Sequence, residues 1–212
     1  MSRAEEAADT TQTDGGPDPV SAPAHLLVRV RLPDRPGALG QVASRIGAVR
    51  GDIVRIDVLQ HGGDEAVDEF ALRLADLGLV PVLVREIGEV DGATVESVRA
   101  VEVVPDARLD ALDSITELLA AQTVLELAEL VCVYARRELH ADWCSFVQGD
   151  RLLAVDGVVA ATSPSVAECP LAAAECRLRV GRNPPFHPRE RAQLEAIGRL
   201  TDGLWALVVR HD

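Results

Sequence analysis

Residues 32–39 read Leu32-Pro33-Asp34-Arg35-Pro36-Gly37-Ala38-Leu39, and the spacing of the apolar residues changes across them. Before this stretch, residues 26–32 place apolar side chains at every second position, which predicts a strand with one buried face. After it, apolar residues at positions 39, 42, 46 and 49 follow one face of a helix. Pro36 has a fixed φ and no N–H, so it can end the strand, and Gly37 lets the backbone approach a neighbour closely. We therefore expect a strand, a tight turn and a helix.

The pattern continues to residue 104. The expected elements, in order, are a strand at 53–59, a hairpin turn at 61–64, a strand at 67–74, a helix with Pro81 in its first turn, and a strand at 95–104. Arg55 and Asp57 are expected to face outward from the first of these strands. The order strand, helix, strand, strand, helix, strand predicts a ferredoxin-like α+β domain, in which both helices cover one face of an antiparallel sheet.

The character of the sequence changes after Pro105-Asp106. The expected elements are one or two helices at 107–139, hairpin strands at 143–147 and 151–155, short strands at 158–161 and 175–181, and a final helix at 188–208. Thr123 and Glu126 form a capping box that would restart the first helix. We expect a small α/β domain with an antiparallel sheet and flanking helices. The predicted organisation is a disordered leader at 1–23, one domain at 24–105 and another at 107–212.

Composition excludes several classes of protein. The net charge is −13 and no run of basic residues occurs, so we expect no nucleic-acid partner. The sequence has no lysine, which excludes a Schiff base to pyridoxal phosphate and a P-loop lysine. No signal peptide and no apolar run of about 18 residues is present, so we expect a cytoplasmic protein without a membrane partner. The four cysteines are then reduced and mostly buried.

Motifs of catalysis and metal binding are missing from the sequence. We find no G-x-S-x-G, H-E-x-x-H, G-x-G-x-x-G or EF-hand pattern, and we expect no enzyme activity, catalytic residue, metal or cofactor. A zinc site drawn from Cys169, Cys176 and His187 would match no known spacing. Cys144 and His140 could form a nucleophile and its base, but the apolar pattern around Cys144 favours a buried structural thiol.

The turn at 32–39, together with the strand start Gly51-Asp52-Ile53, resembles the ACT domain family over residues 25–104. The motifs are D-R-P-G-x-L in the turn and G-x-I at the strand. The resemblance implies a small-molecule regulatory module that associates side by side and binds an effector, most often an amino acid, at an interface near this turn. The residues that it implies for ligand binding are Asp34, Arg35, Pro36, Gly37, Ala38, Leu39, Asp52 and Ile53.

Asp34 and Asp52 stand where amino-acid-binding ACT domains often have asparagine. Asparagine can donate and accept hydrogen bonds, whereas an ionised aspartate only accepts them. Two carboxylates near one pocket favour a cationic group on the ligand. Asp34 could instead cap the helix that follows the turn.

The second half resembles a GAF domain. The carrying residues are Leu178-Arg179-Val180-Gly181-Arg182, then Phe186-His187-Pro188-Arg189-Glu190 and the closing helix. Few residues separate Val158 from Arg177, where a full GAF domain builds the lid of its pocket, so we expect a shortened domain whose helices serve dimerisation. The whole chain is therefore expected to be a non-catalytic regulatory homodimer that binds a small effector. The alternative is a ligand-free dimerisation or adaptor module that acts on a partner protein.

Overall fold

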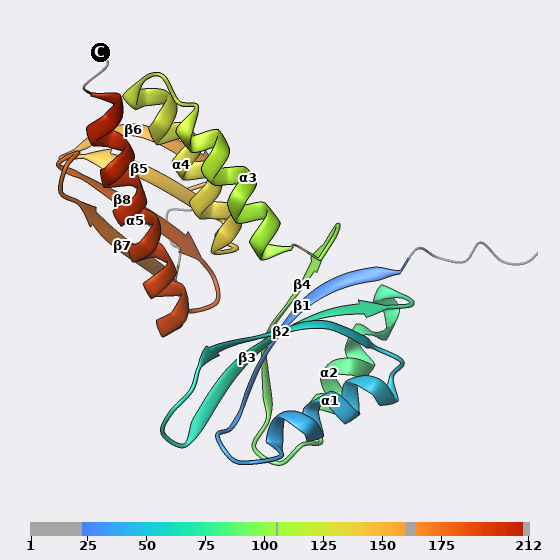
Figure 1. Ribbon diagram of the computed structural model, residues 1–212. Helices are drawn as coiled ribbons and strands as arrows, with labels where there is room; N and C mark the ends of the chain where they lie inside the picture. Colours follow the sequence, from blue (N-terminus) through green and yellow to red (C-terminus); the bar gives the residue numbers. More distant parts are fainter. Residues whose placement is uncertain (1–22, 105, 160–163, 210–212) are drawn as a thin grey trace, which may run out of the picture.

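A computed structural model describes residues 23–104, 106–159 and 164–209 of the chain (Figure 1). The expected disordered leader lies outside these residues, apart from residue 23. The described chain forms two four-stranded sheets, each with its own helices. We call residues 24–101 the N-terminal half and residues 107–208 the C-terminal half.

The N-terminal half has the expected ferredoxin-like order. Its elements are β1 (Ala24–Pro33), α1 (Ala38–Ala48), β2 (Asp52–Gln60), β3 (Glu65–Leu74), a single 3-10 turn η1 (Leu77–Leu79), α2 (Val80–Gly88) and β4 (Thr94–Val101). The strands lie in the order β2-β3-β1-β4, and every neighbouring pair is antiparallel. The predicted fold class is thereby confirmed for this half.

Both helices of this half cover one face of its sheet (Figure 1). Val42 and Ile46 of α1 and Leu83 of α2 pack against strand residues such as Val28 and Phe70, and all of these side chains are buried. Burying a side chain of this size stabilises a fold by about 1.5–3 kcal/mol. The helical spacing in the sequence thus identifies the core face of α1 at Val42 and Ile46, whereas Leu39, at the start of the same predicted stripe, is exposed.

The C-terminal half has a different order. Its elements are α3 (Ala107–Leu119), α4 (Val124–Glu138), β5 (Trp143–Gln148), β6 (Arg151–Gly157), β7 (Ser165–Leu171), β8 (Cys176–Arg182) and α5 (Pro188–Val208). The strands lie in the order β6-β5-β8-β7, all antiparallel. Thr123 restarts the helix as expected, because its hydroxyl accepts a hydrogen bond from the Glu126 N–H at 3.2 Å.

A separate core holds the C-terminal half together. Helix α4 packs on β5 and β6, and α5 packs on β7. Trp205 of α5 stacks on Phe146 of β5 with their ring centroids 5.7 Å apart. This aromatic pair joins the last helix to the sheet.

Strand β7 differs from the prediction. The sequence placed a strand at 158–161, but Val158 and Val159 lie in no strand, and residues 160–161 are outside the described part of the chain. The strand lies instead at Ser165–Leu171, where the buried residues are Ala167, Cys169 and Leu171 and where Pro170 weakens the strand pattern. Because β7 is an edge strand, the missing N–H of Pro170 is tolerated.

A further correction concerns the second face of the N-terminal sheet. The prediction gave β1 one buried face and turned Arg55 and Asp57 of β2 outward. Leu27 and Arg29 are also buried, and Arg55 and Asp57 are half-buried. The reason is that the C-terminal half covers the sheet face opposite α1 and α2 (Figure 1).

The close contact between Gly181 and Trp143 yields a prediction about stability. The two residues are cross-strand partners, and a Cβ on Gly181 would lie 2.3 Å from the indole ring. We expect Gly181→Ala to lower the free energy of unfolding by about 1–3 kcal/mol through overpacking, measured by urea denaturation. Gly203→Ala in α5 is the control, since nothing lies within 4 Å of its added Cβ. An unchanged midpoint for Gly181→Ala would contradict this packing.

Candidate functional site

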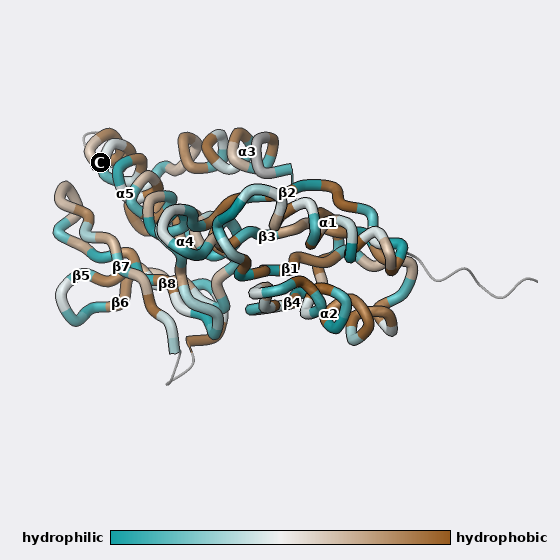
Figure 2. Tube along the Cα trace, turned by 90° about the horizontal axis from the view of Figure 1, so that it is seen from below, coloured by the Kyte–Doolittle hydropathy of each residue, from teal (hydrophilic) through white to brown (hydrophobic). Residues whose placement is uncertain are grey.

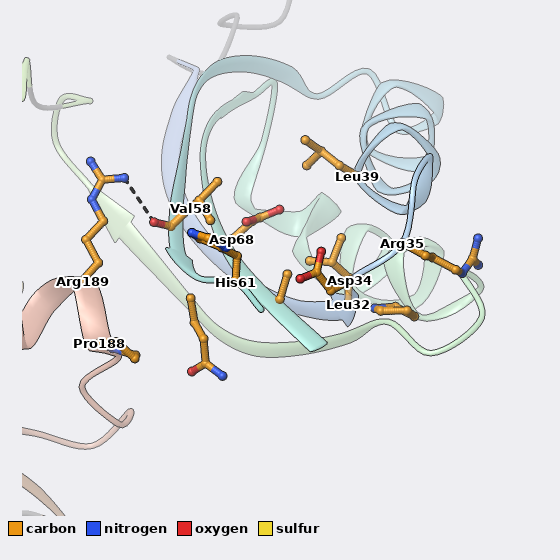
Figure 3. Close-up of a pocket in the computed structure, with 12 residues that line it drawn as sticks. Leu32, Asp34, Arg35, Leu39, Val58, His61, Asp68, Pro188 and Arg189 are labelled. Carbon is orange, nitrogen blue, oxygen red and sulfur yellow. Dashed lines mark hydrogen bonds between the residues drawn. The ribbon is translucent and has the colours of Figure 1, made fainter. Parts of the chain in front are cut away.

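A hollow of about 860 Å³ lies beside the turn that follows β1 (Figure 3). Four parts of the chain surround it: the end of β1 with its turn, the start of α1, the β2–β3 hairpin, and the start of α5. The lining residues are Leu32, Pro33, Asp34, Arg35, Leu39, Val58, Gln60, His61, Ala66, Asp68, Pro188 and Arg189. Both halves of the chain therefore contribute to its wall.

Asp34 ties the turn to the hairpin. Its carboxylate accepts a hydrogen bond from the Gly62 N–H at 2.8 Å, and its own N–H donates to the Asp64 carbonyl at 3.0 Å. The alternative role of Asp34 as a helix cap is not found, because the N-cap of α1 is Gly37 and no side chain caps it. Gly37 has a φ of +89°, a conformation that glycine adopts without strain.

The other turn residues divide between the hollow and the core. Arg35 and Leu39 line the hollow, and Pro36 is exposed in the turn. Ala38 is buried against the N-terminal core. The motif thus places the N-terminal end of α1 beside the hollow, and the first residue of this helix, Ala38, packs in the core.

Asp52 and Ile53 lie away from the hollow. They begin β2, and α1, whose 11 residues span about 16 Å, separates them from the turn. Asp52 pairs with Arg73, whose Nε lies 3.0 Å from the carboxylate, and Ile53 packs against the core. The two aspartates that the resemblance groups together do not meet within one chain.

Asp68 is a site residue that the sequence analysis missed. It lies in β3, faces the hollow and is only 4% exposed. Its Oδ1 atom has no hydrogen-bond partner among the described residues. Burial, and then the nearby charge of Asp34, raise the pKa of the Asp68 carboxyl. The signal that could have identified it is the alternation of the strand, since Asp68 is in phase with the apolar residues Phe70 and Leu72.

The start of α5 is held against the N-terminal sheet. His187 Nδ1 lies 3.2 Å from Gln60 Oε1, and His187 Nε2 lies 2.9 Å from Glu96 Oε2. Arg189 donates to the Val58 carbonyl at 3.1 Å, the contact marked in Figure 3. Gln60 and Val58 both line the hollow, so these contacts position its wall.

A buried tetrad of charges lies next to these contacts and crosses between the halves. Arg29 of β1 donates to Glu69 of β3 at 2.7 Å and to Glu190 of α5 at 2.6 Å. Arg182 of β8 donates to the other oxygen of Glu190 at 2.7 Å. All four side chains are at most 8% exposed. We call Arg29, Glu69, Arg182 and Glu190 the tetrad; two positive and two negative charges balance within it.

Glu190 is the centre of the tetrad. Burial alone would raise the pKa of its carboxyl, but hydrogen bonding from Arg182 and the charges of Arg29 and Arg182 outweigh burial, so the pKa is lowered. The carboxylate also accepts from the His187 N–H at 2.9 Å and so caps α5. One side chain thus fixes the helix start and both arginines.

The cysteines and His140 provide no arrangement for nucleophilic chemistry. Cys144 is fully buried, and hydrogen bonding with Cys132, together with burial, raises the pKa of its thiol. A thiol that stays protonated is a weak nucleophile. His140 instead lies 3.8 Å from Glu69 at the boundary between the halves.

Within residues 23–104, 106–159 and 164–209, no group of three or more His, Cys, Asp or Glu side chains is placed to hold a metal ion. Both ring nitrogens of His187 contact Gln60 and Glu96, so they are not free for a zinc site with Cys169 and Cys176. No helix in the same described ranges is long and apolar enough to cross a membrane.

Comparison with known proteins finds similarity at the level of structure. No protein-family model and no curated protein matches the sequence. The GAF domain of an Acinetobacter phosphoenolpyruvate-protein phosphotransferase is 12% identical and aligns over 51% of this chain and 98% of its own, with a TM-score of 0.39. The ACT domain of GTP pyrophosphokinase from Chlorobium tepidum is 14% identical over 38% and 88%, with a TM-score of 0.30.

A third similar structure spans more of the chain. The regulatory subunit of aspartate kinase from Thermus thermophilus is 13% identical and aligns over 85% of this chain and 92% of its own, with a TM-score of 0.34. The structures that align with parts of this chain thus include an ACT domain and a GAF domain.

The lowered pKa of Glu190 in the tetrad leads us to expect that acid weakens the contact between the two halves. Because the folded pKa of Glu190 is lowered, its stabilisation is fully present above the ordinary pKa of 4.5 and is lost as the pH falls toward the folded pKa. At neutral pH, Glu190→Gln leaves Glu69 as the one negative charge beside two buried arginines, so one positive charge is uncompensated. We expect a loss of about 3–5 kcal/mol in the free energy of unfolding, measured by urea denaturation. The difference from the wild type should narrow below pH 4.5.

The matched control is Glu195→Gln, an exposed position on the same helix. It should change the free energy of unfolding by no more than about 0.5 kcal/mol. Equal effects of the two substitutions at neutral pH would show that the tetrad does not stabilise the interface.

Proposed function

We propose that this protein is a non-catalytic regulatory protein that binds a small effector, of the amino-acid class, in the hollow beside the ACT-like turn. One observation carries the proposal: the hollow adjoins the turn at residues 34–37 and is lined by side chains of both charges. A concave site of several hundred Å³ with a few polar groups is the usual form of a small-molecule site. Asp34 and Asp68 offer negative charge to an effector, and Arg35 and Arg189 offer positive charge.

The signal would pass through the contact between the halves. Pro188 and Arg189 belong to α5, whereas the rest of the wall belongs to the N-terminal half. A ligand that prefers one arrangement of Arg189 against Val58 shifts the population of that arrangement. The C-terminal half would then change its position when a ligand occupies the hollow, and a partner protein would recognise that change.

We also propose a homodimer formed through β2. This strand is at the edge of its sheet, and Val54, Ile56 and Val58 on it are exposed. If two β2 strands pair antiparallel about a twofold axis that passes at Ile56, residue 52 of one copy lies opposite residue 60 of the other. Asp52 and Ile53 of a second copy would then approach the hollow, which accounts for their place in the ACT-like ligand set.

The alternative function is a ligand-free dimerisation or adaptor module. Helix α3 favours it, because its side chains Leu109, Leu112 and Leu119 are 60%, 63% and 62% exposed. This helix lies at the periphery of the molecule, where Figure 2 shows hydrophobic residues along it. Exposed leucines on one helix are typical of a protein-binding surface.

The thiols support two further parts of the proposal, a cytoplasmic location and the absence of a catalytic cysteine. All four cysteines are buried and free, as expected for a protein of the reducing cytoplasm. The raised pKa of the Cys144 thiol, which follows from its hydrogen bond with Cys132 and from burial, supports a structural role in place of a catalytic one.

Effector binding is tested by calorimetry and thermal shift with the standard amino acids on the full chain. We expect saturable binding of at least one, with stabilisation of about 2.7 kcal/mol at a ligand concentration of 100 times Kd. Gly37→Val should weaken binding, because valine disfavours the φ of +89° that shapes the turn.

The control for this substitution is Gly149→Val, which also has a positive φ, of +57°, but lies in the β5–β6 turn. It should lower stability without changing affinity. An absence of heat and of stabilisation with every amino acid would refute effector binding of this class.

The dimer is tested by light scattering of the full chain. Ile56→Asp should convert the dimer to a monomer, because a charge at the strand edge opposes pairing of two such edges. Leu152→Asp, at an exposed position on the edge strand β6, should leave the mass unchanged. A wild-type monomer, or a dimer that survives Ile56→Asp, would exclude the β2 interface.

A further inference from the structure

We propose that the hollow selects its effector by a protonated amine, and that Asp68 is the residue that binds this group. The inference rests on the proposed function, since it names the chemical class of the effector for the same site. It assigns the recognition to a β3 residue outside the turn motif.

The evidence begins with the unsatisfied carboxylate. Asp68 sits opposite Val30 in the sheet register and therefore on the helix-covered face, among core residues. Its side chain is almost fully buried, yet its Oδ1 atom lacks a hydrogen-bond partner among the described residues. A buried polar atom without a hydrogen-bond partner destabilises the fold, so the presence of Asp68 at this position has a reason other than stability.

The surroundings make the charge of Asp68 unfavourable in the free protein. Burial, and then repulsion by Asp34, raise the pKa of the carboxyl, and no opposite charge counteracts them. Figure 3 shows the two carboxylates in the same hollow, on the side where Leu39 of α1 lies. The hollow therefore has a region of concentrated negative charge.

Neither arginine of the hollow pairs with Asp68. Arg189 donates to the Val58 carbonyl and lies 3.9 Å from Asp57, and Arg35 lies 3.4 Å from Gln41. Asp68 forms no ion pair with either of them, nor with any other described residue.

An ammonium group supplies what Asp68 lacks. It brings the opposite charge and up to three N–H donors, and a hydrogen bond between charged partners is about twice as strong as a neutral one. Asp34 would strengthen the attraction, while Arg35 and Arg189, which also line the hollow, offer positive charge to a carboxylate of the same ligand. A hydroxyl in place of the ammonium has no charge to offer, and an anion is repelled.

The test uses the full chain and pairs of probes that differ at one group. We would titrate each standard amino acid against its 2-hydroxy acid analogue, and 1,4-diaminobutane against 1,4-butanediol, by isothermal titration calorimetry. We expect binding only with amine-bearing probes. Asp68→Asn, which keeps the shape of the side chain and removes its charge, should weaken that binding at least tenfold. Asp64→Asn, in the same hairpin but outside the hollow lining, should change it less than twofold.

A measurement without ligand separates recognition from loss of structure. Because the ionised Asp68 is unfavourable in the free fold, Asp68→Asn should raise the Tm of the ligand-free protein by about 2–4 °C. A variant that is more stable and yet binds more weakly supports the inference. A fall in the Tm would overturn it, since it would show that the carboxylate has a structural partner.

The outcomes distinguish the two proposals. An effector that binds equally well as its hydroxy analogue, or equally well to Asp68→Asn, overturns the amine inference and leaves the proposed regulatory function standing. If no probe of either kind binds the wild-type chain, both proposals fail.

Discussion

Glu190 accepts hydrogen bonds from two buried arginines, and the arrangement of the two halves depends on this interaction. Arg29 comes from the N-terminal sheet and Arg182 from the C-terminal sheet, so one carboxylate joins two separately built cores. Charges buried at this depth are tolerated only when they are paired with good geometry. The tetrad meets that condition through its balanced charges. The same geometry permits one docking of the halves and penalises others, because a shifted interface would leave a buried charge alone.

The start of α5 forms part of the wall of the hollow because the two halves dock in this way. Its residues divide their contacts: Glu190 enters the tetrad, His187 reaches Gln60 and Glu96, and Arg189 holds the Val58 carbonyl. Neighbouring residues of one short segment therefore contribute to the buried tetrad and to the more open hollow. A ligand that acts on Arg189 acts on a residue whose neighbour is fixed, which is a favourable arrangement for transmitting a small displacement.

Asp68 is a buried residue whose charge does not match the apolar core around it. Its neighbours on the same face of the sheet, Val30, Ala66 and Phe70, are apolar and buried, and an apolar side chain at this position would fit the same pattern. An unpaired carboxylate reduces the stability of the free protein and gives the hollow a charge to offer. Departures from local consistency of this kind are expected at functional positions. The neighbouring tetrad supplies the contrasting case, in which buried charges are fully paired and serve the structure.

The sequence by itself determined the elements of the N-terminal half, the turn at 34–37, the helix restart at Thr123 and the bounds of α5, because each has a local cause in apolar spacing, capping or proline and glycine. It did not determine β7, because Ala167 and Cys169 at buried positions and Pro170 beside them weaken the strand pattern. Only the tertiary structure decided that Arg29 is buried and that Asp68 and Arg189 share a hollow. Both facts depend on how the second half docks on the N-terminal sheet, and that docking involves long-range charge pairing that no local spacing reveals.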